Sequence, residues 1–361
     1  MTNRMQGVDI ARGIAIILVV FGHLIPLGFV YKFIFSFHMP LFFFFSGFCT
    51  TERIKEKKFA PYLLKKVVTL LIPCWIYVNL YFMIRLGSHD YFAQIKDNLL
   101  LYIIPQNEWF LPTLFGSSIL LWLFSRIDNK IKSVEMQTIV YLLAFVICAG
   151  FANSPIICAK LGVLYPYLFF RFDHVFTCFC FQIAGFWLRN KLPQITDKKL
   201  ELNFYSKILI LFAGVLSLLY TRNNSLINIC SSCYGKDYLL FFAVAFYWIA
   251  IIYLLSKTIY AETDYLRRIL QFLGRYSLYI YIGQGLMIAG EAQILGTYSS
   301  LARKIGFITW DQIGADPYRG GAAYCIIILL VISGVLVATI KCKALLSSLI
   351  TKIHLPRPVN G

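Results

Sequence analysis

An arginine and a histidine stand eleven residues apart in the stretch DIARGIAIILVVFGH, which is otherwise almost entirely apolar. In an α-helix that spacing is three turns plus ~20°, so Arg12 and His23 project from one face, ~16 Å apart along the axis. A neutral imidazole among apolar side chains stays available as a base near neutral pH. Asp9, three residues before Arg12, can share its turn and fix the guanidinium. Ionisable groups within an apolar helix predict a functional site.

A second imidazole lies in the stretch SFHMPLFFFFSGF. Only a few residues separate it from the first stretch, so the two helices are expected to be antiparallel neighbours with His38 and His23 at a similar depth. His38 can orient His23, bind a substrate or act as a second acid or base. The alternative is a kink at Pro40 that an imidazole hydrogen bond holds.

The elements that carry these residues are predicted to be transmembrane helices. Of the 361 residues, 59% are hydrophobic and only 14% are charged, which excludes an ordinary soluble protein. The apolar runs are continuous rather than alternating, so they predict helices and not barrel strands. The predicted class is an all-α polytopic membrane protein with ten spans, at about 9–29, 33–50, 67–86, 109–125, 137–152, 172–188, 206–220, 238–256, 276–296 and 322–340.

Positive charge gives the predicted orientation. Alternate loops hold 23 Lys and Arg residues in one set and ten in the other, which places both termini in the cytoplasm. The net charge of +17 is explained by these loops, so no nucleic-acid partner is expected. The first span has no small-residue cleavage pattern after it and is interpreted as a retained helix. Residues 1–361 are expected to form a single transmembrane domain without an appended extracytoplasmic domain.

Two polar clusters outside the first spans leave alternatives open. Cys230 and Cys233 flank two serines and could form a disulfide or half of a metal site, although one CxxC is a weak signal and no metal is predicted. Arg171, Asp173 and His174 could bind a sugar or could form a salt-bridged helix start.

Four segments together resemble the membrane-bound acyltransferase-3 family. RGIAIILVVFGH fits its Arg-x10-His motif, and SFHMPLFFFFSGF resembles its second-helix signature. EWFLPTLF, from Glu108 to Phe115, is similar to the family's Trp-Phe-Leu-Pro stretch, and LGRYSLYIYIGQ, from Leu273 to Gln284, is similar to its penultimate helix. The matches follow in the expected order from residue 7 to about 284.

The resemblance implies an acyl-coenzyme A donor in the cytoplasm and a carbohydrate hydroxyl as acceptor. His23 matches the catalytic histidine, with His38 beside it, and Arg12 matches the donor-side arginine. The family often has a second arginine where this chain has Thr69, and often a histidine where it has Gln284. The residues expected to bind the donor are Arg12, Asp9, Lys66, Lys65 and Arg275. The residues expected to bind the acceptor are Trp109, Glu108, Arg171, Asp173 and Gln284.

The expected function is therefore O-acylation, most simply acetylation from acetyl-coenzyme A, of a cell-surface glycan or its lipid-linked precursor at a bacterial inner membrane. Acyl-coenzyme A would be a co-substrate, no cofactor would be bound permanently, and the other partners would be the glycan acceptor and membrane lipids. The alternative is a transporter or flippase of a glycan-lipid. That alternative is disfavoured because the sequence lacks repeated halves with paired broken helices.

Overall fold

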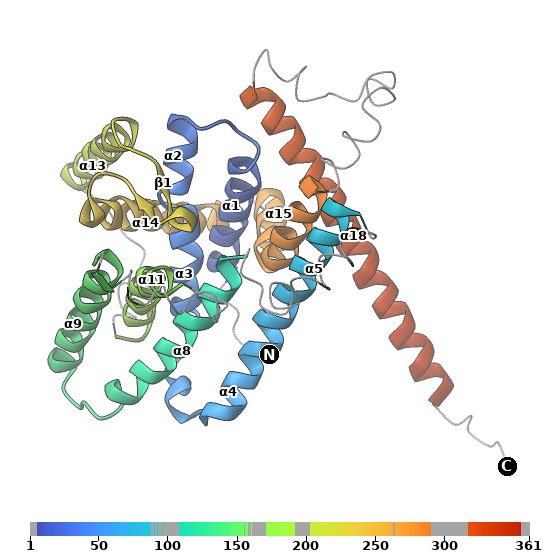
Figure 1. Cartoon of the computed structure of the whole chain (residues 1–361), viewed down its shortest axis with the longest axis horizontal. Coiled ribbons are helices and arrows are strands. Elements are labelled where there is room, and N and C mark those ends of the chain that lie inside the picture. The colour runs from blue at the N-terminus through green and yellow to red at the C-terminus, as the bar shows by residue number, and fades with distance from the viewer. Residues whose placement is uncertain are drawn as a thin grey trace.

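The computed structural model describes residues 6–87, 108–154, 171–191, 203–262, 264–289 and 317–354, with residues 90, 92, 96, 156, 157 and 160 between them. These residues are almost entirely helical, as the sequence predicts (Figure 1). The helices are α1 (Gln6–Gly22), α2 (Phe29–Phe35), α3 (His38–Phe48), α4 (Phe59–Lys66), α5 (Ile72–Leu86), α8 (Phe110–Asp128), α9 (Val134–Asn153), α11 (Phe172–Lys191), α13 (Phe204–Arg222), α14 (Tyr238–Glu262), α15 (Asp264–Arg275), a further helix at Ser277–Ala289, and α18 (Pro317–His354).

Seven helical stretches in the described part are long and apolar enough to cross a membrane. The chain is therefore a multi-pass membrane protein. Each of the ten predicted spans overlaps a described helix, but α1, α11 and the Ser277–Ala289 helix are shorter or more polar than the other seven. The count of ten and the location of the termini stay predictions.

The first two predicted spans differ from the structure at the site itself. The predicted end of the first span at residue 29 is wrong, because α1 ends at Gly22 and His23 lies in the turn that follows. Pro26 and Gly28 stand in that turn, and both residue types end helices. The second predicted span is two helices, α2 and α3, interrupted at Ser36. Pro40 explains the break, since it lacks the N–H that would bond the Ser36 carbonyl.

Helix α1 lies at the centre of the molecule, between α15, α14, α3 and α18 (Figure 1). Helix α3 packs in turn against α11, and α11 contacts α8 and α9. The phenylalanines Phe43, Phe44, Phe45 and Phe48 of α3 are buried in this packing. The site-bearing helices α1 and α3 therefore form the core rather than the lipid-facing surface.

Glycines allow two pairs of these helices to approach closely. A Cβ on Gly47 would clash with the backbone oxygen of Gln182, and one on Gly185 would clash with the backbone oxygen of Phe44, so α3 and α11 touch backbone to backbone. Gly13 and Gly274 make the same kind of contact between α1 and α15. Small residues permit this close approach of helices within a membrane.

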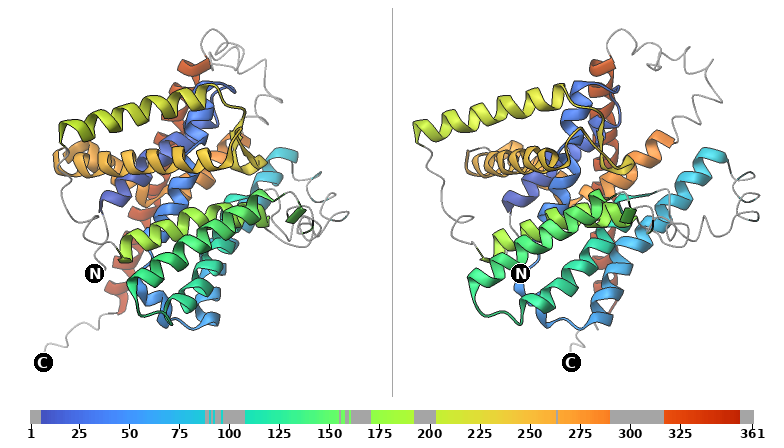
Figure 2. Two further views of the ribbon diagram at one scale, coloured as in Figure 1. Left: turned by 90° about the vertical axis from the view of Figure 1, so that its left-hand side faces the viewer. Right: turned by 60° about the vertical axis from the view of Figure 1, so that its left-hand side comes forward.

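Two shorter elements complete the frame of the site. A π-helical turn, η2 (Val67–Leu71), joins α4 to α5. A small hairpin connects α13 to α14, with strands β1 (Ile227–Asn228) and β2 (Cys233–Tyr234) on either side of the turn η4 (Ile229–Ser231). Figure 2 shows α13 and α14 side by side, and the Tyr247 hydroxyl of α14 donates to the Ile210 carbonyl of α13 at 2.9 Å.

Candidate active site

Both histidines of the first two stretches line one cavity of about 370 Å³, here called the histidine cavity. Its wall comes from the end of α1, from α2, α3 and α5, from the two residues before α8, from the helix at Ser277–Ala289 and from the hairpin. The lining residues are Gly22, His23, Ile25, Tyr31, Phe35, His38, Met39, Tyr77, Glu108, Trp109, Asn228, Ile229, Cys230 and Tyr281.

Each histidine is held by a carbonyl one helical turn before it. Nδ1 of His23 lies 2.7 Å from the Val19 oxygen, and Nδ1 of His38 lies 2.7 Å from the Ile34 oxygen. A carbonyl oxygen only accepts, so Nδ1 carries the hydrogen in both rings and Nε2 keeps its lone pair. The His23 side chain is exposed to the cavity, whereas His38 is 1% exposed. His23 thus presents an oriented base to the cavity.

Glu108 is the carboxylate of the cavity, and its oxygens are well bonded. It accepts the backbone N–H of Phe110 at 3.2 Å and of Leu111 at 2.9 Å, which caps the start of α8. The hydroxyl of Tyr281 and the thiol of Cys74 also donate to it. These contacts fix Glu108 and Tyr281 against each other at one wall of the site.

Arg12 lines a second cavity of about 160 Å³, here called the arginine cavity. Apart from Arg12, Ser46 and Ser277, its wall is made mostly of apolar and aromatic side chains. The guanidinium donates to the Phe45 carbonyl at 3.3 Å. Met39 and Tyr281 line both cavities, so these two side chains form the boundary between the arginine and the histidine.

The structure brings together part of the predicted site. His23, His38, Glu108 and Trp109 meet in the histidine cavity, and Arg12 lies in the adjoining one. The other predicted donor and acceptor residues are not among the described lining residues of either cavity: Asp9, Lys65, Lys66, Arg275, Arg171, Asp173 and Gln284.

These seven residues lie in different environments. Asp9 and Gln284 are buried, at 3% and 3% exposure, while Lys65 and Arg275 are exposed. Lys66 turns inward, and its ammonium donates to the Ser118 hydroxyl at 3.1 Å. The hydroxyl of Thr69 donates to the Lys65 carbonyl of its own helix at 2.7 Å. These positions do not test the donor and acceptor contacts predicted for these residues, which stay predictions.

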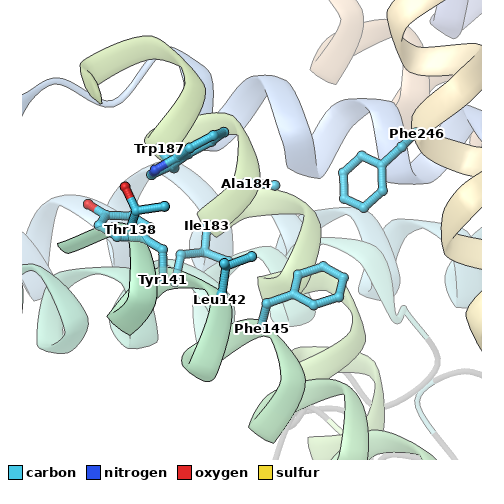
Figure 3. Close-up of a pocket in the computed structure, with 8 residues that line it drawn as sticks. All are labelled: Thr138, Tyr141, Leu142, Phe145, Ile183, Ala184, Trp187 and Phe246. Atoms are coloured by element: carbon cyan, nitrogen blue, oxygen red, sulfur yellow. The ribbon is translucent and has the colours of Figure 1, made fainter. Parts of the chain in front are cut away.

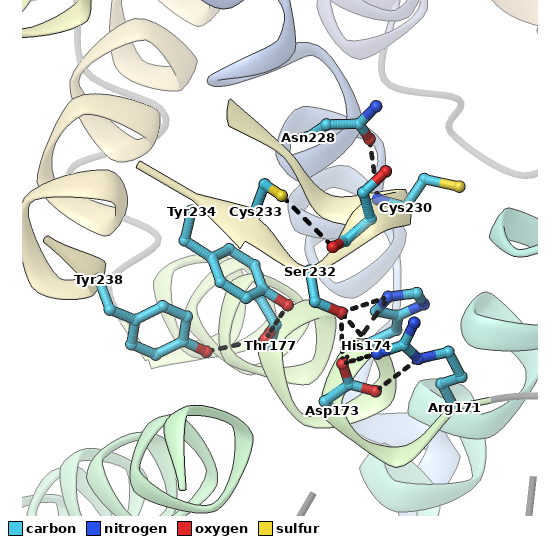
Figure 4. A network of polar contacts seen from close by, with 11 residues as sticks. Arg171, Asp173, His174, Thr177, Asn228, Cys230, Ser232, Cys233, Tyr234 and Tyr238 are labelled. Carbon is cyan, nitrogen blue, oxygen red and sulfur yellow. Dashed lines mark hydrogen bonds and ion pairs between the residues drawn. The ribbon is translucent and has the colours of Figure 1, made fainter. Parts of the chain in front are cut away.

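Arg171 and Asp173 fasten the hairpin to the start of α11 (Figure 4). The guanidinium pairs with both oxygens of Asp173 and donates to the Ser232 hydroxyl at 2.8 Å. Ser232 donates to Asp173 at 2.6 Å, so its contact with His174 Nε2 at 3.1 Å requires that nitrogen to carry the hydrogen. His174 is therefore not a base toward Ser232, and the four residues form a closed structural cluster, here called the hairpin latch.

The latch borders the histidine cavity. Trp109 meets His174 edge to face with ring centroids 5.7 Å apart, and Asn228 and Cys230 of the latched hairpin line the cavity. Asn228 also donates to the Tyr31 hydroxyl at 3.0 Å. Sequence reasoning missed the hairpin as a wall of the site, because strands of two residues leave no alternating pattern. It also missed Tyr281, although Tyr281 lies within the LGRYSLYIYIGQ stretch.

The CxxC cysteines are both free thiols, and the Cys233 thiol donates to the Ser231 carbonyl at 3.4 Å (Figure 4). Partial desolvation at the wall of the histidine cavity, and after it the nearby Glu108 carboxylate, raises the pKa of the Cys230 thiol above its ordinary value. Among the described residues, no group of three or more His, Cys, Asp or Glu is arranged to hold a metal ion.

An apolar pocket of about 270 Å³ lies between α9, α11 and α14 (Figure 3). Tyr141, Leu142 and Phe145 of α9 face Ile183 and Trp187 of α11 across it. None of its described lining residues belongs to the histidine or the arginine cavity. It contributes no group that could take part in chemistry at His23.

Comparison with known proteins gives the family of this chain. A family model described as an acyltransferase domain matches residues 5–340, which is nearly the whole chain. The chain belongs to the acyltransferase-3 family. The predicted resemblance is confirmed, and acyl transfer is the activity that the family name gives.

Two relatives carry the name nodulation protein NolL. The one from Mesorhizobium japonicum is 23% identical over 350 residues, covering 87% of this chain and 91% of the relative. The one from Sinorhizobium fredii is 29% identical over 206 residues, covering 52% of this chain and 53% of the relative. No solved structure matches the chain.

Proposed function

We propose that this acyltransferase-3 protein transfers an acetyl group from acetyl-coenzyme A to a hydroxyl of a cell-surface glycan or its lipid-linked precursor, at a bacterial inner membrane. The observation that carries the proposal is the pair of cavities that share Met39 and Tyr281. One cavity contains a fixed cation and the other contains an oriented base. A two-substrate transfer needs such a division, with the reacting atoms meeting at the boundary.

The predicted orientation assigns a substrate to each cavity. With the N-terminus inside, the arginine cavity is the one nearer the cytoplasm, where coenzyme A is available. Its apolar wall and its volume of about 160 Å³ suit the part of the donor next to the thioester. The histidine cavity offers an acceptor sugar the carboxylate of Glu108, the amide of Asn228 and the rings of Trp109 and Tyr77.

The chemistry follows from the tautomer of His23. Its Nε2 removes the proton from the acceptor hydroxyl as that oxygen attacks the thioester carbonyl. The C–O bond forms, the C–S bond breaks, and the histidine returns the proton to the departing thiolate. The hydrogen bond from Nδ1 to the Val19 carbonyl stabilises the imidazolium that exists between these two transfers. His38, with the same tautomer and 1% exposure, supports the site beside His23.

The deciding experiment measures transfer of radiolabelled acetyl groups from acetyl-coenzyme A into glycan in membranes. We expect His23→Ala to lower the rate by about 10²- to 10⁴-fold, the usual contribution of a general base. We expect Arg12→Ala to lower it mainly by raising the KM for the donor. Arg222→Ala is the matched control, because that arginine is exposed in the last turn of α13 and lies outside both cavities.

Equal labelling by the wild type, His23→Ala and Arg12→Ala would overturn the proposal. A transporter of glycan-lipid would instead move the acceptor across the membrane without any label from the donor. Transport that persists in His23→Ala without labelling in the wild type would assign the chain to that class.

A further inference from the structure

A chain of buried and half-buried polar side chains, here called the polar chain, connects four helices beside the arginine cavity. The Lys66 ammonium of α4 lies 3.1 Å from the Ser118 hydroxyl of α8. The Gln182 amide of α11 lies 3.4 Å from the same hydroxyl and 3.1 Å from the Ser46 hydroxyl of α3. Ser46 lines the arginine cavity, so the chain reaches the site proposed for the donor.

Helix geometry places the polar chain directly beyond the wall of the arginine cavity. On α3, Met39, Phe42 and Ser46 follow at the spacing of one helix face, and all three line the cavity. On α8, Leu111 and Leu114 line the cavity, and Ser118 is one turn further along the same face. On both α3 and α8, the face that lines the arginine cavity is apolar near Met39 and ends at a serine hydroxyl.

Gln182 stands where the two serines converge. It is 1% exposed, and its Oε1 has no hydrogen-bond partner among the residues that the structure describes. Buried polar atoms are nearly always bonded, and a site surrounded by membrane-spanning helices offers little bulk water. The contact of Gly47 with the Gln182 backbone brings α3 and α11 close enough for the carboxamide to reach Ser46.

We propose that Gln182, Ser118 and Ser46 form a subsite for the amide groups of the pantetheine arm of the donor. This inference rests on the proposed function. Below its thioester, a pantetheine arm carries two amides, each with one N–H donor and one carbonyl acceptor. The free Oε1 of Gln182 accepts an amide N–H, and the hydroxyls of Ser46 and Ser118 donate to an amide carbonyl.

The register fits a thioester at the cavity boundary. Ser46 lies seven residues after Met39, which is about two turns or ~10 Å along α3. A thioester at Met39 and Tyr281 therefore leaves the amides of the arm beside the apolar wall and the polar chain. Lys66 closes the polar chain at its far side and is also the residue predicted to bind donor phosphate.

The test compares two ligands on the purified full chain in lipid nanodiscs: coenzyme A, and adenosine 3′,5′-bisphosphate, which has the nucleotide part without the pantetheine arm. We expect the wild type to bind coenzyme A more tightly than the bisphosphate. We expect Gln182→Met and Ser118→Ala each to raise the Kd for coenzyme A by about five- to tenfold. The Kd for the bisphosphate should stay unchanged in both variants. Ser117→Ala is the matched control, because Ser117 is also buried on α8 but donates to the Leu114 carbonyl of its own helix.

The outcomes separate this inference from the proposed function. Unchanged coenzyme A affinity in both variants, with binding by the wild type, would overturn the subsite and leave the proposed function standing. Equal weakening of both ligands in Ser118→Ala would also overturn the subsite, since a structural role would produce it. No binding of coenzyme A by the wild type would overturn the proposed donor. Ser118→Ala removes a single oxygen atom and keeps the test decisive if Gln182→Met does not fold.

Discussion

Glu108 acts on both the fold and the site, because one carboxylate caps α8 and holds Tyr281. It is 4% exposed, so water cannot readily replace it as the acceptor for the groups that donate to it. The same side chain faces the histidine cavity. We therefore expect a substitution of Glu108 to lower the stability of the fold as well as to change the histidine cavity.

We predict that Glu108→Ala lowers the unfolding temperature in detergent. The lost cap costs about 0.5–2 kcal/mol, and the Tyr281 hydroxyl left without its acceptor costs about 1–3 kcal/mol more. Glu108→Gln keeps one carbonyl oxygen and should lose less. Glu135→Ala, at an exposed glutamate in the first turn of α9, is the control and should change the unfolding temperature little. An equal loss in all three variants would contradict the assigned cap.

The hairpin latch leads to a prediction about acceptor binding. Asp173→Asn weakens the contacts with Arg171 and Ser232 that hold the hairpin over the histidine cavity. We expect the KM for the acceptor to rise several-fold while the KM for the donor stays unchanged, as measured by initial rates against each substrate. Asp237→Asn, beside the same hairpin but bonded to the Leu240 N–H, should change neither. A rise in the donor KM alone would contradict this role.

At the scale of elements, the contacts of α3 with α11 and of α1 with α15 depend on glycine. Gly47 and Gly185 each face a backbone atom of the opposite helix at the place where a Cβ would stand. A side chain at either position would push α3 and α11 apart. The α3–α11 contact also sets the reach of Gln182 to Ser46.

Gly47→Ala and Gly185→Ala are each expected to destabilise the protein by about 1–3 kcal/mol, the usual cost of overpacking a core. Gly150→Ala in α9 is the matched control, because its Cβ would meet nothing within 4 Å. That variant should gain about 0.5–1 kcal/mol, since alanine is the better helix former. Thermal unfolding of the three variants in one detergent measures the difference, and equal effects would contradict the close approach.

Helix positions were largely predictable from sequence, and their contacts were not. Each of the ten spans predicted from hydropathy overlaps a described helix, while the roles predicted for Arg12 and His23 stay predictions. Gln182 and Ser118 gave no signal, because a single polar residue in an apolar helix has no motif until the crossing at Gly47 is known. The turn after Gly22 was predictable from Pro26 and Gly28, but the length of the apolar run concealed it.

At the scale of the whole molecule, the orientation in the membrane can be tested with native cysteines. Cys230 in the hairpin and Cys49 after α3 are both exposed, and the predicted topology places them on opposite sides. We expect a membrane-impermeant maleimide added outside intact cells to label a variant with only Cys230, and a variant with only Cys49 to react only after lysis.

The pH dependence of that labelling gives a second check. The raised pKa of the Cys230 thiol keeps it mostly protonated at neutral pH, and the thiolate is the reactive form. The labelling rate of Cys230 should therefore still rise about tenfold per pH unit at pH 8, where the labelling rate of an ordinary thiol begins to level off. Labelling of Cys49 from outside would reverse the predicted orientation.

The whole-molecule architecture explains why the wall of the histidine cavity was harder to predict than the spacing of Arg12 and His23. Arg12 lies in α1 and His23 directly follows its last residue, so their spacing along the helix axis follows almost entirely from periodicity. The histidine cavity is closed by Asn228 and Cys230, some two hundred residues later in the chain. No local pattern joins the hairpin to α1, and the packing of α2 against β1 and α13 brings them together.

The π-helical turn at Val67–Leu71 sets the angular phase between the two halves of one span. An α-helix advances about 100° per residue, and a single π-turn absorbs one extra residue without passing that rotation on to the helix that follows. A deletion of Val68 that restored regular α-helix would therefore leave Cys74 and Tyr77 facing Glu108 and the histidine cavity. An alanine inserted within α5 between Ile72 and Cys74 has no such turn to absorb it and would turn both side chains away from that wall.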